Sequence, residues 1–233
     1  MRKLLSFILL ILPLTAMAQS AMPIMEYVDS TGATVTDETS YDGAPISVNF
    51  YANPQDVGNY KAYYEWDIYC TYTNKDGTTL ATDTIKRFQE NTTYNFEQSG
   101  SYVIQLFITF YNEGDTIEYV QEEPFSVFIS QSQLEFPNAF TPNDEEPNNI
   151  FKARNQQSII EFEAAVFTRS GRKIYEWKDP EGGWDGKDGS KDAPDGVYYL
   201  HVKAKGADRR EYKINQAITL LRKYREDTGI TSE

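Results

Sequence analysis

The chain has 233 residues, and its 35 acidic against 22 basic side chains give a formal net charge of −13. This acidic balance disfavours nucleic acid and anionic lipid as partners, because both repel a negatively charged surface. The one cysteine, Cys70, excludes an internal disulfide, so the domains must be held together by hydrophobic cores.

The first 18 residues have the layout of a cleavable secretory signal. Arg2 and Lys3 precede an apolar stretch at residues 4–14, and small residues stand at positions 16 and 18. That stretch is shorter than the roughly 20 residues that a membrane-spanning helix needs. We therefore expect export, cleavage after Ala18 and no insertion into the membrane.

The front half alternates apolar and polar residues in short runs. Residues 19–42, rich in Ser, Thr, Gly and Asp, predict an extended lead-in or a poorly paired first strand. From residue 43 to residue 130, alternation is clear at 46–50, 64–72 and 101–111. Side chains of a strand point alternately to opposite faces, so each run predicts a half-buried strand. Strands about ten residues apart predict an antiparallel β-sandwich.

The same pattern continues from residue 131 to residue 222, followed by a charged tail at 223–233. The polar stretch SQSQ at residues 130–133 lies where the charge balance changes. Residues 19–130 carry four basic against 17 acidic side chains, whereas residues 131–233 carry 16 against 18. The sequence therefore predicts an all-β chain of two sandwiches, a front domain at 43–130 and a second domain at 131–222, joined near residue 131.

Four blocks in the second half carry a family resemblance. They are FPNAFTPN at 136–143, AVFTRSGRKIYEW at 165–177, GWDG with APDGVYY within 183–199, and NQAITLLR at 215–222. In this order they resemble the gliding-motility-associated C-terminal domain, the type B sorting domain of the type IX secretion system. The resemblance covers residues 134–222. It implies an immunoglobulin-like sandwich that addresses an exported protein across the outer membrane, with the type IX machinery as a partner.

The front half resembles another family. The string TTYNFEQSGSYVIQLFITF at residues 92–110 is similar to the polycystic-kidney-disease (PKD) type of immunoglobulin-like domain. The alternation itself predicts the same sandwich. Both halves are thus expected to be immunoglobulin-like antiparallel β-sandwiches in tandem.

The loop between residues 183 and 199 is rich in aspartate and glycine, and two interpretations stay open. Asp-Gly pairs and a proline are typical of tight turns. The carboxylates are also hard ligands of an irregular structural calcium site, although their spacing does not fit an EF-hand; they are Asp185, Asp188, Asp192 and Asp195. The oxygen-rich residues 143–149 likewise predict either a solvated loop or a cation site.

Side chains inside the family blocks are candidate contacts for a protein partner. They are Arg169, Trp184, Asp185 and Arg222, and the alternative for Trp184 is that it closes one end of the sandwich. His201 has no second histidine beside it, and Cys70 shares a strand face with Trp66, so we expect structural roles for both. Tyr60, Tyr63 and Tyr69 are expected either to pack or to form a sugar platform.

No arrangement of a nucleophile with a base, no phosphate loop and no cofactor motif is present, so an enzyme is not expected. We expect a small accessory or signalling protein of the secretion system that acts through protein–protein binding. The family resemblance implies that the second domain can serve as a ligand for a periplasmic sensor histidine kinase domain. The alternative is a cell-surface cargo protein with an adhesion or matrix-binding role. These two readings differ in whether the protein stays in the periplasm or reaches the surface.

Overall fold

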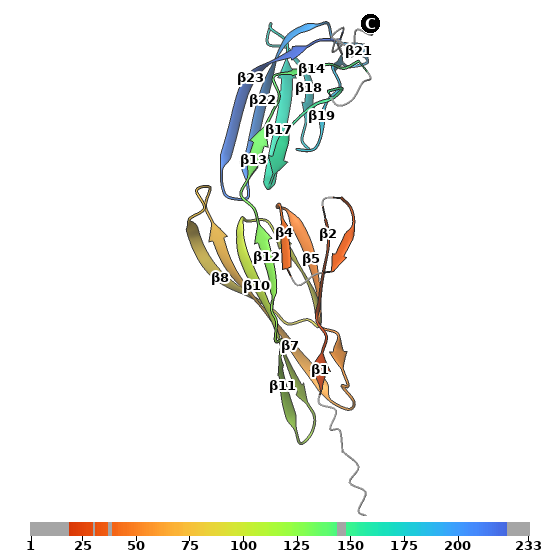
Figure 1. The fold of residues 1–233 in the computed structure, drawn as a ribbon, viewed down its shortest axis with the longest axis vertical. Helices are drawn as coiled ribbons and strands as arrows, with labels where there is room; N and C mark the ends of the chain where they lie inside the picture. The colour runs from red at the N-terminus through yellow and green to blue at the C-terminus, as the bar shows by residue number, and fades with distance from the viewer. Residues whose placement is uncertain (1–18, 30, 37–38, 144–147, 223–233) are drawn as a thin grey trace, which may run out of the picture.

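Figure 1 shows the computed structural model of the chain, which describes residues 19–29, 31–36, 39–143 and 148–222. The signal segment, the charged tail and all three acidic residues of the 143–149 loop lie outside these residues. In the described part every regular element is a β-strand, and no helix could span a membrane. Two groups of strands lie one after the other along the long axis (Figure 1). The all-β fold with tandem sandwiches is therefore confirmed.

The front domain packs two main sheets face to face. One has the order β3-β2-β5-β9 and consists of β2 (Ile24–Val28), β3 (Thr34–Thr36), β5 (Ile46–Tyr51) and β9 (Asn91–Phe96). The other has the order β4-β12-β10-β7-β8, with β11 also paired to β10. Its strands are β4 (Thr39–Asp42), β7 (Lys61–Thr73), β8 (Thr79–Arg87), β10 (Gly100–Tyr111), β11 (Thr116–Val120) and β12 (Phe125–Ile129). The short strands β1 (Ser20–Ala21) and β6 (Pro54–Gln55) pair with each other.

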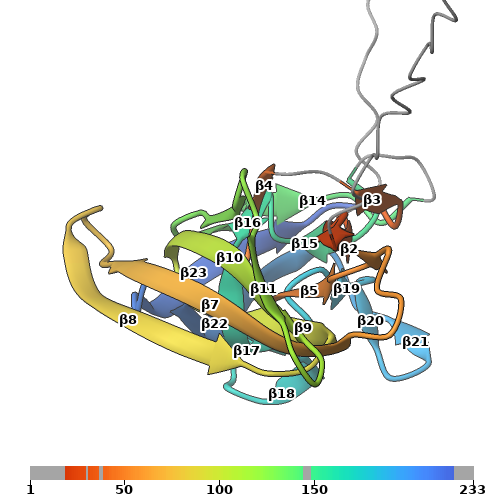
Figure 2. The same ribbon diagram turned by 90° about the horizontal axis from the view of Figure 1, so that it is seen from below.

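The alternation in the sequence becomes the two faces of each strand. Along β10 the inward residues are all buried, and they are Tyr102, Ile104, Leu106, Ile108 and Phe110. Trp66 of β7 is fully buried among them, and its indole N–H donates a 3.1 Å hydrogen bond to the carbonyl of Gln89. Figure 2 shows β8 at the outer edge of this sheet, beyond β7 and β10.

The first strands are paired more fully than the sequence indicated. Residues 19–42 were expected as an extended lead-in or a poorly paired strand. Instead β2 pairs with β5 over residues 24–27 and buries Met25, which is 1% exposed. A burial of this kind depends on a partner strand far along the chain, which local composition does not reveal.

The second domain is built around one five-stranded sheet of order β14-β23-β22-β17-β18. Its strands are β14 (Ala139–Phe140), β17 (Ile159–Phe167), β18 (Lys173–Trp177), β22 (Gly196–Gly206) and β23 (Glu211–Leu220). Three small sheets complete the domain. They pair β13 (Gln133–Glu135) with β16 (Asn155–Gln157), β15 (Phe151–Lys152) with β19 (Gly183–Trp184), and β20 (Lys187–Asp188) with β21 (Lys191–Asp192).

Both domains contain the same tyrosine corner. The hydroxyl of Tyr102 donates a 2.6 Å hydrogen bond to the carbonyl of Gln98, four residues upstream. The hydroxyl of Tyr198 donates a 2.7 Å bond to the carbonyl of Pro194, also four residues upstream. A tyrosine that bonds back to the chain just before its own strand is a feature of immunoglobulin-like sandwiches. The two domains therefore share this tyrosine-to-carbonyl hydrogen bond as well as the sandwich architecture.

Candidate functional site

Arg222 closes the loop end of the second domain. Its guanidinium donates to three backbone carbonyls, those of Ala193 at 3.2 Å, Pro142 at 3.1 Å and Gly186. The backbone N–H of Arg222 donates a 3.0 Å bond to the carboxylate of Asp195. Because Pro142 follows β14 and both Gly186 and Ala193 belong to the Asp-Gly loop, Arg222 ties the end of β23 to the exit of β14 and to that loop. This is a positioning role inside the fold.

Gly186 makes this arrangement possible. Its φ of +79° lies in the left-handed region, where residues with a Cβ are strained. A Cβ there would also come within 2.9 Å of the Pro142 ring and 3.1 Å of the Arg222 guanidinium. The glycine in the GWDG block is thus required by a close approach as well as by the turn.

The four aspartates of this loop each have a bonding partner within the protein. Asp188 forms a two-point ion pair with Arg172, at 3.2 and 2.6 Å. This pair lowers the pKa of the Asp188 carboxyl and raises the pKa of the Arg172 guanidinium. Asp185 accepts the backbone N–H of Lys187 at 3.0 Å, Asp195 accepts that of Arg222, and Asp192 lies 3.5 Å from the Arg222 guanidinium. The described residues hold no group of three or more metal-ligating side chains.

The four candidate contacts for a partner do not form one surface. Trp184 is fully buried, and its indole N–H donates a 2.7 Å bond to the carbonyl of Lys187. Arg222 is occupied with backbone carbonyls, as described above. Arg169 is exposed in the turn between β17 and β18, and Asp185 is half-buried. Of the four, Arg169 is the most exposed.

The remaining candidate residues have ordinary surroundings. Cys70 is 2% exposed in the front core, and burial raises the pKa of its thiol. His201 is exposed on β22, with its ring 4.9 Å from that of Phe167. Tyr60 donates a 2.7 Å bond to Asp115, whereas Tyr63 and Tyr69 are 48% and 42% exposed on the outer face of the front domain.

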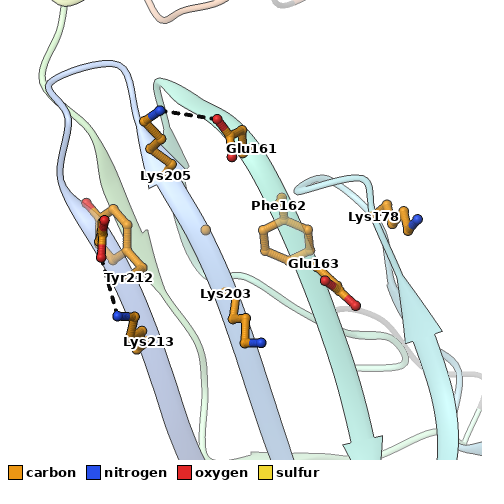
Figure 3. Close-up of a pocket in the computed structure, with 10 residues that line it drawn as sticks. Glu161, Phe162, Glu163, Lys178, Lys203, Lys205, Tyr212 and Lys213 are labelled. Carbon is orange, nitrogen blue, oxygen red and sulfur yellow. Dashed lines mark hydrogen bonds and ion pairs between the residues drawn. The ribbon is translucent and has the colours of Figure 1, made fainter.

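A shallow hollow lies over β17, β22 and β23 of the second domain (Figure 3). Four lysines and three glutamates line it around Phe162 and Tyr212, and two of its ion pairs join Lys205 to Glu161 at 3.3 Å and Lys213 to Glu211 at 3.4 Å. Opposite charges are thus interspersed along its walls. The hollow resembles an ion-paired sheet surface more than a binding pocket.

The junction between the domains is bonded from both sides, and Ser132 in it is buried. Ser132 is 1% exposed; its hydroxyl donates a 2.6 Å bond to the buried carboxylate of Asp208, and its backbone N–H lies 3.3 Å from the same group. Because that hydroxyl has a single hydrogen, the Tyr212 hydroxyl at 2.9 Å must be the donor to Ser132. Ser130 accepts a 2.7 Å bond from the hydroxyl of Ser99, and its own hydroxyl lies 2.9 Å from that of Ser158.

The turn between β22 and β23 reaches into the front domain (Figure 1). Ala207 at its tip is 3% exposed and packs with the buried core of the front domain. Its carbonyl accepts a 3.2 Å bond from the N–H of Ser99, and its N–H donates a 2.9 Å bond to the carbonyl of Ser158. Arg210, just beyond the turn, donates a 2.9 Å bond to the carbonyl of Lys75. The second domain therefore covers the end of the front core that faces it.

The sequence did not reveal this junction. The SQSQ stretch indicated a polar boundary, and the Gly-Ala-Asp sequence at residues 206–208 is by itself typical of no more than a turn. Four polar residues in a row are typical of a solvent-exposed linker. Here Ser130, Gln131 and Ser132 bond to the protein instead, and their partners lie 28 to 80 residues away in the chain. Asp208, the buried partner in this turn, cannot be told from a surface aspartate by sequence alone.

Comparisons with known proteins place the second domain in a family. The model of the CHU_C Type IX secretion signal domain matches residues 134–219. A solved structure of a tetra-tandem repeat in the extending region of a large adhesion protein is 11% identical, with a TM-score of 0.26, over 88% of this chain and 68% of that chain. BcpA, the major pilin subunit of Bacillus cereus, is 12% identical, with a TM-score of 0.24, over 86% of this chain and 69% of its own. No curated protein gives a significant match.

The matched range contains all four blocks on which the sequence resemblance rests, except the last three residues of NQAITLLR. It also contains the tyrosine corner of the second domain and the loop that Arg222 closes. Residues 134–219 therefore match the type IX secretion signal domain, the family that the sequence indicated, and this signal makes the chain an exported protein.

Proposed function

We propose that the protein is a small accessory or signalling protein of the type IX secretion system, which keeps its second domain and acts by binding another protein. The signal domain and the all-β fold point to a non-enzymatic exported protein. The observation that carries the proposal is the buried junction around Ser132 and Asp208. A protease needs an accessible, extended segment, and at the buried and bonded Ser132 the junction does not offer one.

Loss of the second domain would also damage the first. Ala207 packs into the front core, so cutting the chain near residue 131 and removing the second domain would expose apolar surface there. In a cargo protein whose signal is removed, the payload is expected to be complete without it. The packing of Ala207 in the front core supports a protein that functions with both domains attached.

The proposed partner is a periplasmic sensor histidine kinase domain, with the second domain as its ligand. Arg169 is the candidate contact, since it is exposed in a block of the family pattern. Binding of the full chain to purified sensor domains, measured by calorimetry, tests this. Arg169→Ala is expected to weaken binding while leaving thermal unfolding unchanged. Binding that is equal for both proteins would remove Arg169 from the interface, and no binding to any sensor domain would contradict the partner.

The retention of the second domain has its own test. The native protein is located and its intact mass measured in fractionated cells, with and without a working type IX translocon. A form that contains residues 131–222 and stays in the periplasm in both strains is expected. A shortened or conjugated form at the cell surface, lost when the translocon is blocked, would instead establish a cargo protein.

One observation favours that second function, cell-surface cargo with an adhesion or matrix-binding role. The outer face of the larger front sheet exposes aromatic and aliphatic side chains, Tyr63 and Tyr69 among them. Surfaces of this kind bind other molecules. The intact-mass experiment separates the two functions, because adhesion requires the protein to be at the surface.

A further inference from the structure

The outer face of the sheet β12-β10-β7-β8 is unusually apolar for a surface open to solvent. We call it the aromatic face. The strand register places its residues in neighbouring rows, for example Val103 beside Tyr69 and Thr109 beside Tyr63. The large apolar side chains around it that are 37–52% exposed are Tyr63, Tyr69, Phe88, Val103, Tyr111, Val120 and Phe128. Exposed apolar side chains that gather on one face in this number mark an interaction site.

The facing sheet of the same domain has a different outer surface. Across β5 and β9 most outward residues are polar, namely Ser47, Asn49, Asn91, Thr93 and Asn95, and Tyr51 is the aromatic exception, beside Asn91. Two of them bond to each other, since the Thr93 hydroxyl donates a 2.7 Å bond to the Asn49 side chain. The large apolar side chains exposed on this sheet are Ile24 and Val28 of β2, so its outer surface carries fewer of them than the aromatic face. The difference is not a consequence of the fold, which treats the two outer faces alike.

A bonded charge cluster holds the middle of the aromatic face. Asp67 points outward yet is only 6% exposed, because Lys86 donates to both of its carboxylate oxygens at 2.8 and 2.9 Å. Lys86 also pairs with Glu65, and the Tyr69 hydroxyl donates a 3.2 Å bond to Asp67. These contacts raise the pKa of the Lys86 ammonium, Asp67 first and Glu65 second. Tyr69 is therefore held in place before any partner arrives, which lowers the entropy lost on binding.

Aromatic contacts order the other end of the face. The rings of Tyr63 and Phe88 stack with centroids 5.9 Å apart. Next to them, Phe107 of β10 is paired with Val120 of β11 and Glu65 of β7. Rigid aromatic anchors are among the side chains that dominate protein–protein binding energy.

The size of the face suits a protein. Strand β10 spans 12 residues, or about 40 Å, and four strands cover about 15–19 Å, so the face offers roughly 600–750 Å². A stable interface buries about 800 Å² on each partner. The charge decides which protein: residues 19–130 carry four basic against 17 acidic side chains, so a second copy of this domain is repelled and a positively charged surface is attracted.

We propose that the aromatic face is a docking surface for a positively charged protein other than this chain. The partner's apolar side chains would cover Tyr69 and Val103 on one side of the charge cluster and Tyr63 and Phe88 on the other. The partner's arginines or lysines would reach the tyrosine rings and Glu65, whose side chain is 30% exposed. This inference concerns the front domain and is independent of the partner proposed for the second domain.

Photocrosslinking in the cells that make the protein tests the proposal. The photoreactive residue p-benzoylphenylalanine replaces Tyr69 or Val103 in the full chain, and Thr93 on the opposite sheet in the control. A discrete adduct with one basic protein is expected from positions 69 and 103 and not from position 93. No adduct, equal adducts from all three positions, or an adduct with a second copy of this chain would overturn the proposal.

The crosslinked protein is then purified and its affinity for the full chain measured. Tyr69→Ala and Tyr63→Ala are expected to weaken binding by about tenfold each, as for anchors at interface centres. Asn95→Ala on the opposite face should leave affinity unchanged, and added salt should weaken binding. Equal affinities for all variants would overturn the proposal. The proposal would also be overturned if no basic protein crosslinks and the full chain instead binds an insoluble neutral polysaccharide that the Tyr63→Ala variant does not bind.

Discussion

The hydroxyl of Ser132 donates a 2.6 Å hydrogen bond to the carboxylate of Asp208, and both side chains are shielded from solvent. Ser132 belongs to the segment between the domains, whereas Asp208 belongs to a hairpin turn of the second domain. A carboxylate that is fully buried is costly unless it is hydrogen-bonded, and here Arg210 also donates its backbone N–H at 3.1 Å. The junction is thus a packed and bonded part of the protein.

Gly206 allows the junction to close, and Gly206→Ala is expected to open it. A Cβ at this position would lie 2.1 Å from the Ser132 hydroxyl and 2.5 Å from the Asp208 carboxylate. Forcing an extra methyl into a packed site costs about 2 kcal/mol. Thermal unfolding should show a lower midpoint, and limited proteolysis should cut the variant near residues 130–133. Gly114→Ala, where a Cβ meets nothing within 4 Å, is the matched control. Resistance of Gly206→Ala equal to that of the control would contradict the prediction.

Arg222→Ala is expected to destabilise the second domain by about 3 kcal/mol, since it leaves three backbone carbonyls without their charged donor. Chemical denaturation followed by tryptophan fluorescence measures this loss. Arg169→Ala removes a similar side chain from an exposed turn and should change stability by less than about 0.5 kcal/mol. A loss of the same size in both variants would show that Arg222 does not hold the loops together.

The two tyrosine corners are expected to contribute equally. Tyr102→Phe and Tyr198→Phe each delete one hydroxyl that bonds to a carbonyl four residues upstream. Each change should cost about 1 kcal/mol, because packing is kept and only one hydrogen bond is lost. Equilibrium unfolding of both variants checks this. No change in the free energy of unfolding at either position would show that the hydrogen bond there adds no net stability and would contradict the prediction.

Asp188→Asn should reveal a pH-dependent ion pair. The Arg172 guanidinium lowers the pKa of Asp188, so the carboxylate stabilises the folded state above the unfolded pKa of about 3.9. That contribution is lost as the pH falls through the lower pKa of the folded state. The variant should therefore unfold at a lower temperature than wild type at neutral pH, and the gap should close in acid. A gap that is constant from neutral to acidic pH would contradict the pairing.

Millimolar calcium is expected to leave the unfolding temperature of the full chain unchanged. The carboxylates of the Asp-Gly loop bond to Arg172, to Arg222 and to backbone N–H groups, so a cation would have to displace these contacts. Differential scanning fluorimetry with calcium and with a chelator makes the comparison. An unfolding temperature that rises with calcium and does so less in Asp192→Asn would restore the metal interpretation of this loop.

The sequence by itself determined the strand content and the family. Alternation at residues 101–111 is a local property, because the side chains of a strand point to opposite faces whatever lies beyond. The structure confirms it, since the five inward residues of β10 are all buried. The four blocks of the second half likewise indicated the signal domain that residues 134–219 match. Both conclusions rest on short stretches of chain.

Only the tertiary structure decided what the junction and the loop residues do. Ser132 reads as a linker residue until Asp208, 76 residues away, is placed beside it. Arg222 and Trp184 stand in recognisable blocks, yet one bonds to backbone carbonyls and the other fills the core, because the segments that surround them come from distant parts of the chain. Long-range pairing of polar groups has no local signature, and it is this pairing that separates a flexible linker from a buried joint.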